Sequence, residues 1–262
     1  MKIGFFDSGL GGLYLLRSML RSKLSKYDFV FLGDTKNLPY GEKSQEEIYE
    51  LTRNAVEFLF NQGCGLVIVA CNTSSAQALR KIQQKFLKSS YPDKKVLGVI
   101  RPTVELIKAG NVCVLATSST VNAKAYTKEL KNINPKLKIT EIAAPELVPL
   151  IESGHLDKLS IKVKEYADLV REKKVKNLIL GCTHYAIVRD EFAQHLKGIK
   201  IISQESIVPV KLQDYLDNHP EIERNLSQRN ERKFFVTKLN PTFHKSAKLW
   251  FGKKLVLTLA KV

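Results

Sequence analysis

Cysteine is scarce in this sequence, with four residues among 262, and no two of them form a Cys-x-x-Cys pair. The four are Cys64, Cys71, Cys113 and Cys182. A disulfide framework of the secreted type needs a denser set of cysteines. We therefore expect reduced thiols in a reducing compartment, with Cys64 and Cys113 as small core residues because their neighbours are apolar.

Long apolar runs are also missing, since no stretch approaches the roughly 20 residues that a membrane-spanning helix requires. The N-terminus carries one lysine and then Asp7, which is not the pattern of a secretory signal. These two absences predict a cytoplasmic protein with no membrane contact. The length suits one large domain or two small ones.

Acidic residues are few beside basic ones, 26 against 42, and the formal net charge is +16. Such a charge would suit nucleic acid or an acidic membrane surface. The lysines, however, are spread along the chain, and no aromatic residues are interleaved with them in a stacking motif. We therefore favour a solvated basic surface, which could help to attract an anionic substrate.

Two stretches share one pattern: Leu66–Ser74 and Leu178–Tyr185 each run from apolar residues to a cysteine and then a threonine. Each predicts a buried strand that enters a helix through a tight turn. Cys71 and Cys182 would then lie at the carboxyl ends of strands, where open α/β sheets bind their ligands. This similarity suggests two half-sites that face one cleft.

The rest of the chain alternates strands and helices in two successive runs. The first run has strands at 2–6, 29–33, 66–70 and 95–100, with helices at 44–61 and 74–87; Ser44 and Glu47 form a predicted capping box. The second has strands at 112–116, 137–142, 177–180 and 200–202, with helices from the 117–120 turn to 131, at 145–153, at 156–173 and from the turn after Cys182 to about 196. This repetition predicts two similar α/β lobes with mostly parallel sheets.

Two thiols on opposite sides of one carbon could move a proton from one face to the other, because a thiol is both a usable base and a usable acid. Asp7 could assist one thiol, and His184 could assist Cys182. Carboxylates could be held by hydroxyls and amides of Ser8, Asn72, Thr73 and Thr183.

Other interpretations of these residues stay open. Cys71, Cys182 and His184 could ligate a metal, although zinc sites usually show closer pairing. Cys71 could instead be a nucleophile with His184 as its base, which leaves Cys182 unexplained. Both cysteines could also be ordinary core residues, but two matching strand ends would then be a coincidence.

Five motifs together resemble the glutamate racemases of the aspartate/glutamate racemase family. They are Phe6-Asp7-Ser8-Gly9-Leu10-Gly11-Gly12, Gly33-Asp34-Thr35, Pro39-Tyr40-Gly41, Ala70-Cys71-Asn72-Thr73 and Gly181-Cys182-Thr183-His184-Tyr185. The resemblance implies interconversion of L- and D-glutamate for peptidoglycan synthesis, without pyridoxal phosphate, any other cofactor or a metal. It also implies a homodimer. The lobes would comprise residues 1–97 plus 209–262 and residues 98–208, with the active site in the cleft between them.

The resemblance also assigns roles to residues. Cys71 would take the α-proton of D-glutamate with help from Asp7, and Cys182 that of L-glutamate with help from His184. Substrate contacts would come from Asp7, Ser8, Tyr40, Gly41, Asn72, Thr73, Thr117, Thr120, Thr183 and His184. One departure from the family pattern is Ser203-Gln204-Glu205, which replaces a turn of the Asp-Ser-Gly kind.

Three alternatives to a glutamate racemase fit parts of the sequence. The first is an aspartate racemase of the same superfamily, because side-chain length is discriminated by details of the cleft. The second is a non-catalytic basic binding protein, since some relatives bind DNA gyrase; contact with gyrase or nucleic acid is not favoured. The third is a thiol redox protein, which would need the two sulfurs at bonding distance.

Overall fold

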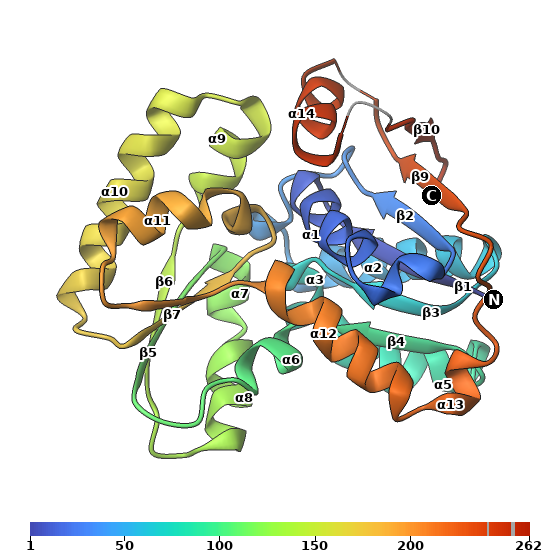
Figure 1. Cartoon of the computed structure of the whole chain (residues 1–262), viewed down its shortest axis with the longest axis horizontal. Helices are drawn as coiled ribbons and strands as arrows, with labels where there is room; N and C mark the ends of the chain where they lie inside the picture. The colour runs from blue at the N-terminus through green and yellow to red at the C-terminus, as the bar shows by residue number, and fades with distance from the viewer. Residues whose placement is uncertain (240, 253–254) are drawn as a thin grey trace.

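The computed structural model describes residues 1–239, 241–252 and 255–262 and contains two sheets, whose strands are all paired in parallel within these ranges (Figure 1). The first sheet has the order β10-β9-β2-β1-β3-β4, and the second has the order β6-β5-β7-β8. We call each sheet with its covering helices a lobe. The two parallel sheets confirm the predicted fold class.

The strands of the first lobe are β1 (Lys2–Asp7), β2 (Phe29–Gly33), β3 (Cys64–Val69), β4 (Lys95–Gly98), β9 (Arg232–Val236) and β10 (Thr258–Leu259). Those of the second are β5 (Asn111–Ala116), β6 (Lys138–Ala143), β7 (Asn177–Gly181) and β8 (Lys200–Ile202). The order β2-β1-β3-β4 matches β6-β5-β7-β8, so the same arrangement occurs twice. In each lobe the chain changes direction across the sheet at its first strand, and ligands bind at such switch points.

The central strands β1, β2, β3, β5 and β7 are buried on both faces, as parallel sheets require. In β1, Ile3 and Phe5 belong to the core under one face of the first sheet, whereas Phe6 belongs to the core under the other. This alternation follows from the two-residue repeat of a strand. Helices must therefore cover both faces of each sheet.

On the first sheet, one face is covered by α1 (Leu10–Leu20), α12 (Gln204–Asp217) and α14 (Pro241–Phe251). The other face is covered by α2 (Gln45–Asn61) and by the segment that contains α3 (Asn72–Gln77), α4 (Leu79–Lys81) and α5 (Leu87–Ser90). Short 3₁₀ helices occur at η1 (Lys23–Lys26) and η2 (Tyr40–Glu42), and α13 (Pro220–Glu223) follows α12. The chain thus returns to the first lobe after β8.

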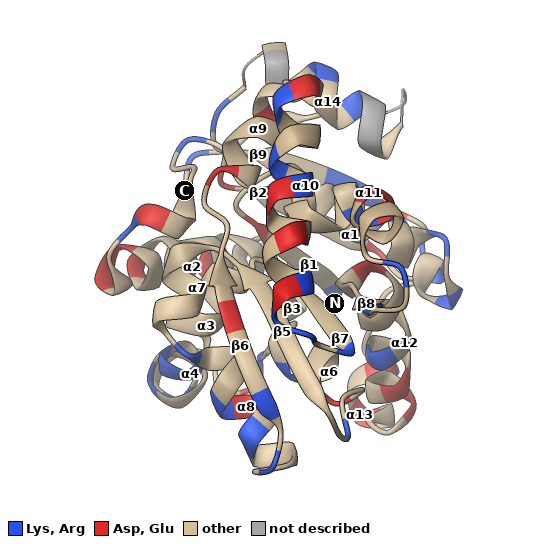
Figure 2. Cartoon of the chain, turned by 90° about the vertical axis from the view of Figure 1, so that its left-hand side faces the viewer, with Lys and Arg blue, Asp and Glu red and all other residues tan. Residues whose placement is uncertain are grey.

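On the second sheet, one face is covered by α9 (Leu147–Ser153), α10 (Leu156–Glu172) and α11 (Arg189–His195). The other face is covered by α6 (Ile100–Val104), α7 (Ser118–Asn122) and α8 (Ala125–Ile133). Basic and acidic segments are interspersed over α8, α10 and α12 on the side seen in Figure 2. No helix in the described ranges is both long and apolar enough to cross a bilayer.

Predicted bounds of helices are confirmed where a side chain hydrogen-bonds to the nearby backbone. They are wrong where the backbone bends. The capping box is present, because Ser44 accepts from the Glu47 amide and Glu47 accepts from the Ser44 amide. The predicted strand 95–100 ends at Gly98, since Ile100 already begins α6, which holds Pro102 in its first turn. The predicted helix to 131 is two helices, because Lys124 has a left-handed φ of 53°.

The predicted helix 74–87 is also wrong in its bounds and its continuity. It begins at Asn72, directly after Cys71, and reaches Ser90 through the π turn η3 (Ile82–Phe86). The predicted lobe boundaries at 97/98 and 208/209 stay predictions.

Candidate active site

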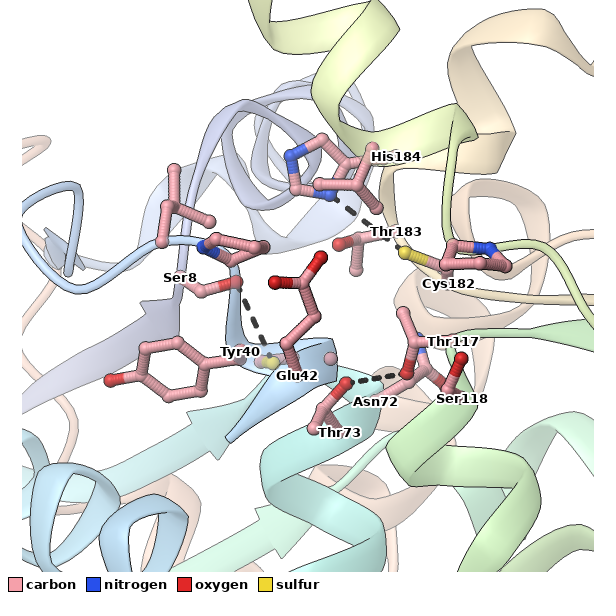
Figure 3. A pocket seen from close by; sticks show the side chains of 16 residues that line it. Ser8, Tyr40, Glu42, Asn72, Thr73, Thr117, Ser118, Cys182, Thr183 and His184 are labelled. Carbon is pink, nitrogen blue, oxygen red and sulfur yellow. Dashed lines mark hydrogen bonds between the residues drawn. The ribbon is translucent and has the colours of Figure 1, made fainter. Parts of the chain in front are cut away.

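A cavity of about 450 Å³, including its open mouth, lies between the two lobes (Figure 3). It is placed at the carboxyl ends of central strands: Ser8 follows β1, Cys71 follows β3, Thr117 follows β5 and Cys182 follows β7. The residues that the sequence singled out and that line the cavity are Ser8, Tyr40, Gly41, Cys71, Asn72, Thr73, Thr117, Cys182, Thr183 and His184. Asp7 and Thr120 lie behind this lining.

The two cysteines occupy equivalent positions of the repeated topology, because β3 and β7 are the third strands of their sheets. Both thiols are free, and both line the same cavity. One cavity therefore receives a sulfur from each lobe.

Cys71 is backed by a serine and a carboxylate. The Ser8 hydroxyl lies 3.7 Å from Sγ of Cys71 and donates to Oδ1 of Asp7 at 3.5 Å. Burial, together with the negative charge of Asp7, raises the pKa of the Cys71 thiol to about 12, although hydrogen bonds from Ser74 and Ser8 oppose this shift. Cys71 therefore carries its proton at neutral pH.

The Asp7 carboxylate is fully buried and is held at both oxygens. Oδ1 accepts from the Gly9 amide at 3.0 Å, and Oδ2 accepts from the Thr183 hydroxyl at 2.9 Å. Burial raises the pKa of Asp7, and the charge of His184 and these two hydrogen bonds partly oppose it. Asp7 can therefore exchange a proton more readily than an exposed carboxylate could at neutral pH.

Cys182 is backed by a histidine and a second carboxylate. Nδ1 of His184 lies 3.8 Å from Sγ of Cys182, and Nε2 lies 2.6 Å from Oε1 of Glu152. Burial alone would lower the pKa of His184, but its hydrogen bonds to Cys182 and Glu152 and the charge of Glu152 raise the pKa well above its usual value. His184 is therefore an imidazolium at neutral pH.

Glu152 was missed by the sequence analysis. It lies on α9, and its Oε1 also accepts from the amide of Leu10 at the start of α1, 2.8 Å away. Its partners are 142 and 32 residues distant, so no local pattern marks it. A carboxylate near the N-terminus of a helix is favourable for the same reason as an N-cap.

Three threonine hydroxyls gather on one side of the cavity. Oγ1 of Thr117 lies 2.9 Å from that of Thr73 and 3.0 Å from that of Thr120. Thr117 also caps α7 by accepting from the Thr120 amide. Gly41 is packed against Thr117 so closely that a Cβ at position 41 would lie 2.9 Å from the Thr117 Cβ. A larger residue at position 41 would push the two lobes apart here.

The remaining lining residues were not predicted; they are Leu38, Pro39, Glu42, Ser118, Pro145 and Val148. Figure 3 shows the Glu42 carboxylate pointing into the cavity, whereas the Tyr40 hydroxyl points away from it. That hydroxyl donates to Asp34 at 2.5 Å, so Tyr40 offers the cavity its ring and backbone. Glu42 follows directly on the Pro39-Tyr40-Gly41 motif, which is the signal that could have identified it.

Chemically, the site combines two thiols from opposite sides with hydroxyl and amide donors between them. Each thiol has its own backing group, and the two groups differ in charge. Such a pair suits removal of a proton on one face of a carbon and its return on the other. Among the residues that the structure describes, no three His, Cys, Asp or Glu side chains come together as metal ligands.

Comparison with known proteins gives a consistent result. The sequence model of the family described as Asp/Glu/Hydantoin racemase matches residues 15–208. A glutamate racemase of Dinoroseobacter shibae is 36% identical over 85% of this chain and 86% of its own, and one of Persephonella marina is 34% identical over 98% and 96%. The crystal structure of a glutamate racemase from Francisella tularensis, in complex with D-glutamate, superposes with a TM-score of 0.87 at 29% identity, over 99% of this chain and 97% of that one.

Proposed function

Since the chain belongs to the Asp/Glu/Hydantoin racemase family, we propose that it interconverts L- and D-glutamate by passing the α-proton between Cys71 and Cys182. The resemblance seen in the sequence motifs is confirmed, and the chain is an amino-acid racemase, an isomerase. One observation carries the two-thiol mechanism: the equivalent cysteines of the two lobes line one cavity. The curated relatives favour glutamate over aspartate as the substrate.

In the direction from L- to D-glutamate, the sulfur of Cys182 acts as the base. It takes the α-proton from one face and leaves a planar carbanion, to which Cys71 delivers its own proton from the other face. The raised pKa of Cys71 suits it as the proton donor in this direction. The reverse direction exchanges the roles, so each turnover removes one proton and adds one.

The backing groups keep the two thiols ready for opposite roles. The His184 imidazolium, 3.8 Å from Cys182, stabilises negative charge that develops on that sulfur, and Glu152 holds the ring in place. Asp7 acts on Cys71 from behind Ser8, where it can accept the thiol proton when D-glutamate is the substrate.

The substrate is held by groups that donate or accept hydrogen bonds around the reacting carbon. We assign substrate contacts to Ser8, Tyr40, Gly41, Asn72, Thr73, Thr117, Thr183 and His184, which line the cavity. Thr120 supports Thr117 from behind, and Asp7 supports Ser8. Hydroxyls and amide groups in a buried site bind carboxylates well, because water does not compete there.

We further propose a cytoplasmic homodimer that supplies D-glutamate for peptidoglycan synthesis. The family resemblance supports the dimer and this role. The interspersed charges in Figure 2 support a solvated surface rather than a nucleic-acid site on that side.

The test is racemisation by the purified protein, followed by circular dichroism with L-glutamate and with L-aspartate. We expect activity on glutamate in the presence of a reductant and a chelator and without added cofactor. Racemisation of aspartate alone would replace the proposed substrate. Loss of activity in the reductant would point to redox chemistry of the two thiols.

A further inference from the structure

The side-chain amides of Asn72 and Gln204 form a reciprocal pair. Nδ2 of Asn72 donates to Oε1 of Gln204 at 2.9 Å, and Nε2 of Gln204 donates to Oδ1 of Asn72 at 2.7 Å. The exposed fractions of the two residues are 2% and 1%. Asn72 is the first residue of α3, and Gln204 is the first residue of α12, so the pair joins the starts of two helices that are distant in the sequence.

Tyr126 of α8 is the third member of this cluster. Its hydroxyl donates to Oδ1 of Asn72 at 2.7 Å and lies 3.2 Å from Nε2 of Gln204. Oδ1 of Asn72 thus has two donors, which is the number that an amide oxygen accepts. The Asn72 amide is therefore fixed in rotation by one residue of the second lobe and by the start of α12.

The fixed orientation of the Asn72 side chain matters because of where Asn72 lies. Asn72 lines the cavity and directly follows Cys71, whereas Gln204 and Tyr126 are absent from the cavity lining. A buried amide that loses its partners turns to find others, because an unpaired polar group is costly in the interior. The direction in which Asn72 presents itself to the cavity therefore depends on Gln204.

We propose that Gln204 is a positioning residue of the racemase, which holds the Asn72 amide in the orientation that binds the substrate. This inference rests on the proposed function, because it takes Asn72 as a contact of glutamate. Gln204 itself does not touch the substrate. Its effect should consequently fall on substrate binding rather than on the proton-transfer steps.

A neighbouring glutamine provides a matched control. Gln77 also lies on α3, and its Nε2 donates to the backbone oxygen of Ser119 on α7 at 2.9 Å and to the Ser119 hydroxyl at 3.0 Å. It joins the same helix to the second lobe through a side-chain amide, but its amide is hydrogen-bonded to Ser119 rather than to Asn72, and it does not line the cavity. Loss of the hydrogen bonds between Gln77 and Ser119 therefore shows how much a contact between the lobes contributes to KM when Asn72 is not involved.

The experiment compares KM and kcat for both enantiomers of glutamate in the full-length protein. Gln204→Leu keeps the volume and removes the hydrogen bonds, and we expect KM to rise about tenfold while kcat changes less than about threefold. Gln204→Glu keeps the shape but loses the donor to Oδ1, so KM should rise comparably. Tyr126→Phe removes one donor and should raise KM about threefold. For Gln77→Leu we expect a KM within about twofold of the wild type.

The outcomes separate this inference from the proposed function. If the wild type racemises glutamate but Gln204→Leu keeps its KM, or if Gln77→Leu raises KM as much, Gln204 is not a positioning residue. If Gln204→Leu does not fold, Gln204→Glu decides, and an unchanged KM in that variant overturns the proposal. If the wild type does not racemise glutamate, the proposed function fails instead.

Discussion

The Thr183 hydroxyl donates a hydrogen bond of 2.9 Å to Oδ2 of Asp7, and this bond crosses the cleft from the second lobe to the first. Each of these residues is close to a different thiol. Thr183 directly follows Cys182, and Asp7 accepts a hydrogen bond from Ser8, whose hydroxyl lies next to Cys71. The bond lowers the pKa of Asp7, while burial raises it. One lobe therefore tunes the proton affinity of the other.

Thr183→Val should weaken activity in a pH-dependent manner. The valine has nearly the same shape but no hydroxyl, so the pKa of Asp7 rises further and the acid limb of the kcat/KM profile moves to higher pH. We expect kcat/KM at neutral pH to fall about tenfold. Thr183→Ser keeps the donor and serves as the control, and an unshifted acid limb in the valine variant would contradict the tuning of Asp7 by this bond.

Cys71→Ser and Cys182→Ser should each lower kcat by about 10³-fold, because a hydroxyl is a much weaker acid and base than a thiol in proton transfer. Cys113→Ala is the matched control, since Cys113 is equally buried but belongs to the core of the second lobe and does not line the cavity. Circular dichroism of the glutamate reaction measures all three. Retained racemisation in either serine variant would refute a role for that thiol.

Glu42→Gln should lower KM for glutamate roughly fivefold, with kcat little changed. The Glu42 carboxylate points into the cavity and repels an anionic substrate, and the loss of one exposed charge at close range is worth about 1 kcal/mol. Glu46→Gln removes an equal charge from α2, where Glu46 pairs with Lys81 outside the cavity. A lower KM in both variants would mean that net charge, rather than the position of Glu42, is responsible.

Glu152→Gln should destabilise the protein at low pH more than at high pH. The pKa of His184 is raised in the folded state, so its charged pair with Glu152 contributes stability that is fully present below the unfolded value of 6.5. This contribution, about 2 kcal/mol, is lost as the pH rises through the folded-state pKa of His184.

Chemical denaturation of the wild type and Glu152→Gln across this range measures the difference between their free energies of unfolding. Glu50→Gln is the control, because Glu50 pairs with Arg53, which stays charged throughout. A difference between wild type and Glu152→Gln that does not shrink with rising pH would count against the protonated His184.

The sequence was sufficient wherever a local pattern determines the structure. Each apolar run that stops at Cys71 or Cys182 predicted a buried strand before a polar turn, and the capping box of Ser44 predicted the start of α2. The parallel α/β fold followed from the repeated alternation, because strands joined through helices pair in parallel.

The sequence was insufficient where a contact joins distant segments or the backbone bends without glycine or proline. Glu152 and Gln204 are informative only once α9 and α12 are placed against the first lobe. The left-handed Lys124 and the π turn at Ile82–Phe86 carry no residue that requires them. Hydrophobic periodicity therefore predicts which segments are helices and strands. Tertiary contacts determine where the helices break and which side chains lie behind the two thiols.

The most direct test of the account is the reaction of the wild-type protein in D₂O, stopped at low conversion and analysed by mass spectrometry of the separated enantiomers. Starting from L-glutamate, Cys182 removes protium while Cys71 delivers deuterium acquired from the solvent. We expect one deuterium at the α-carbon of D-glutamate and protium in the remaining L-glutamate. Protium retained in the D-glutamate product would show that one group moves the proton across both faces, which contradicts two facing thiols.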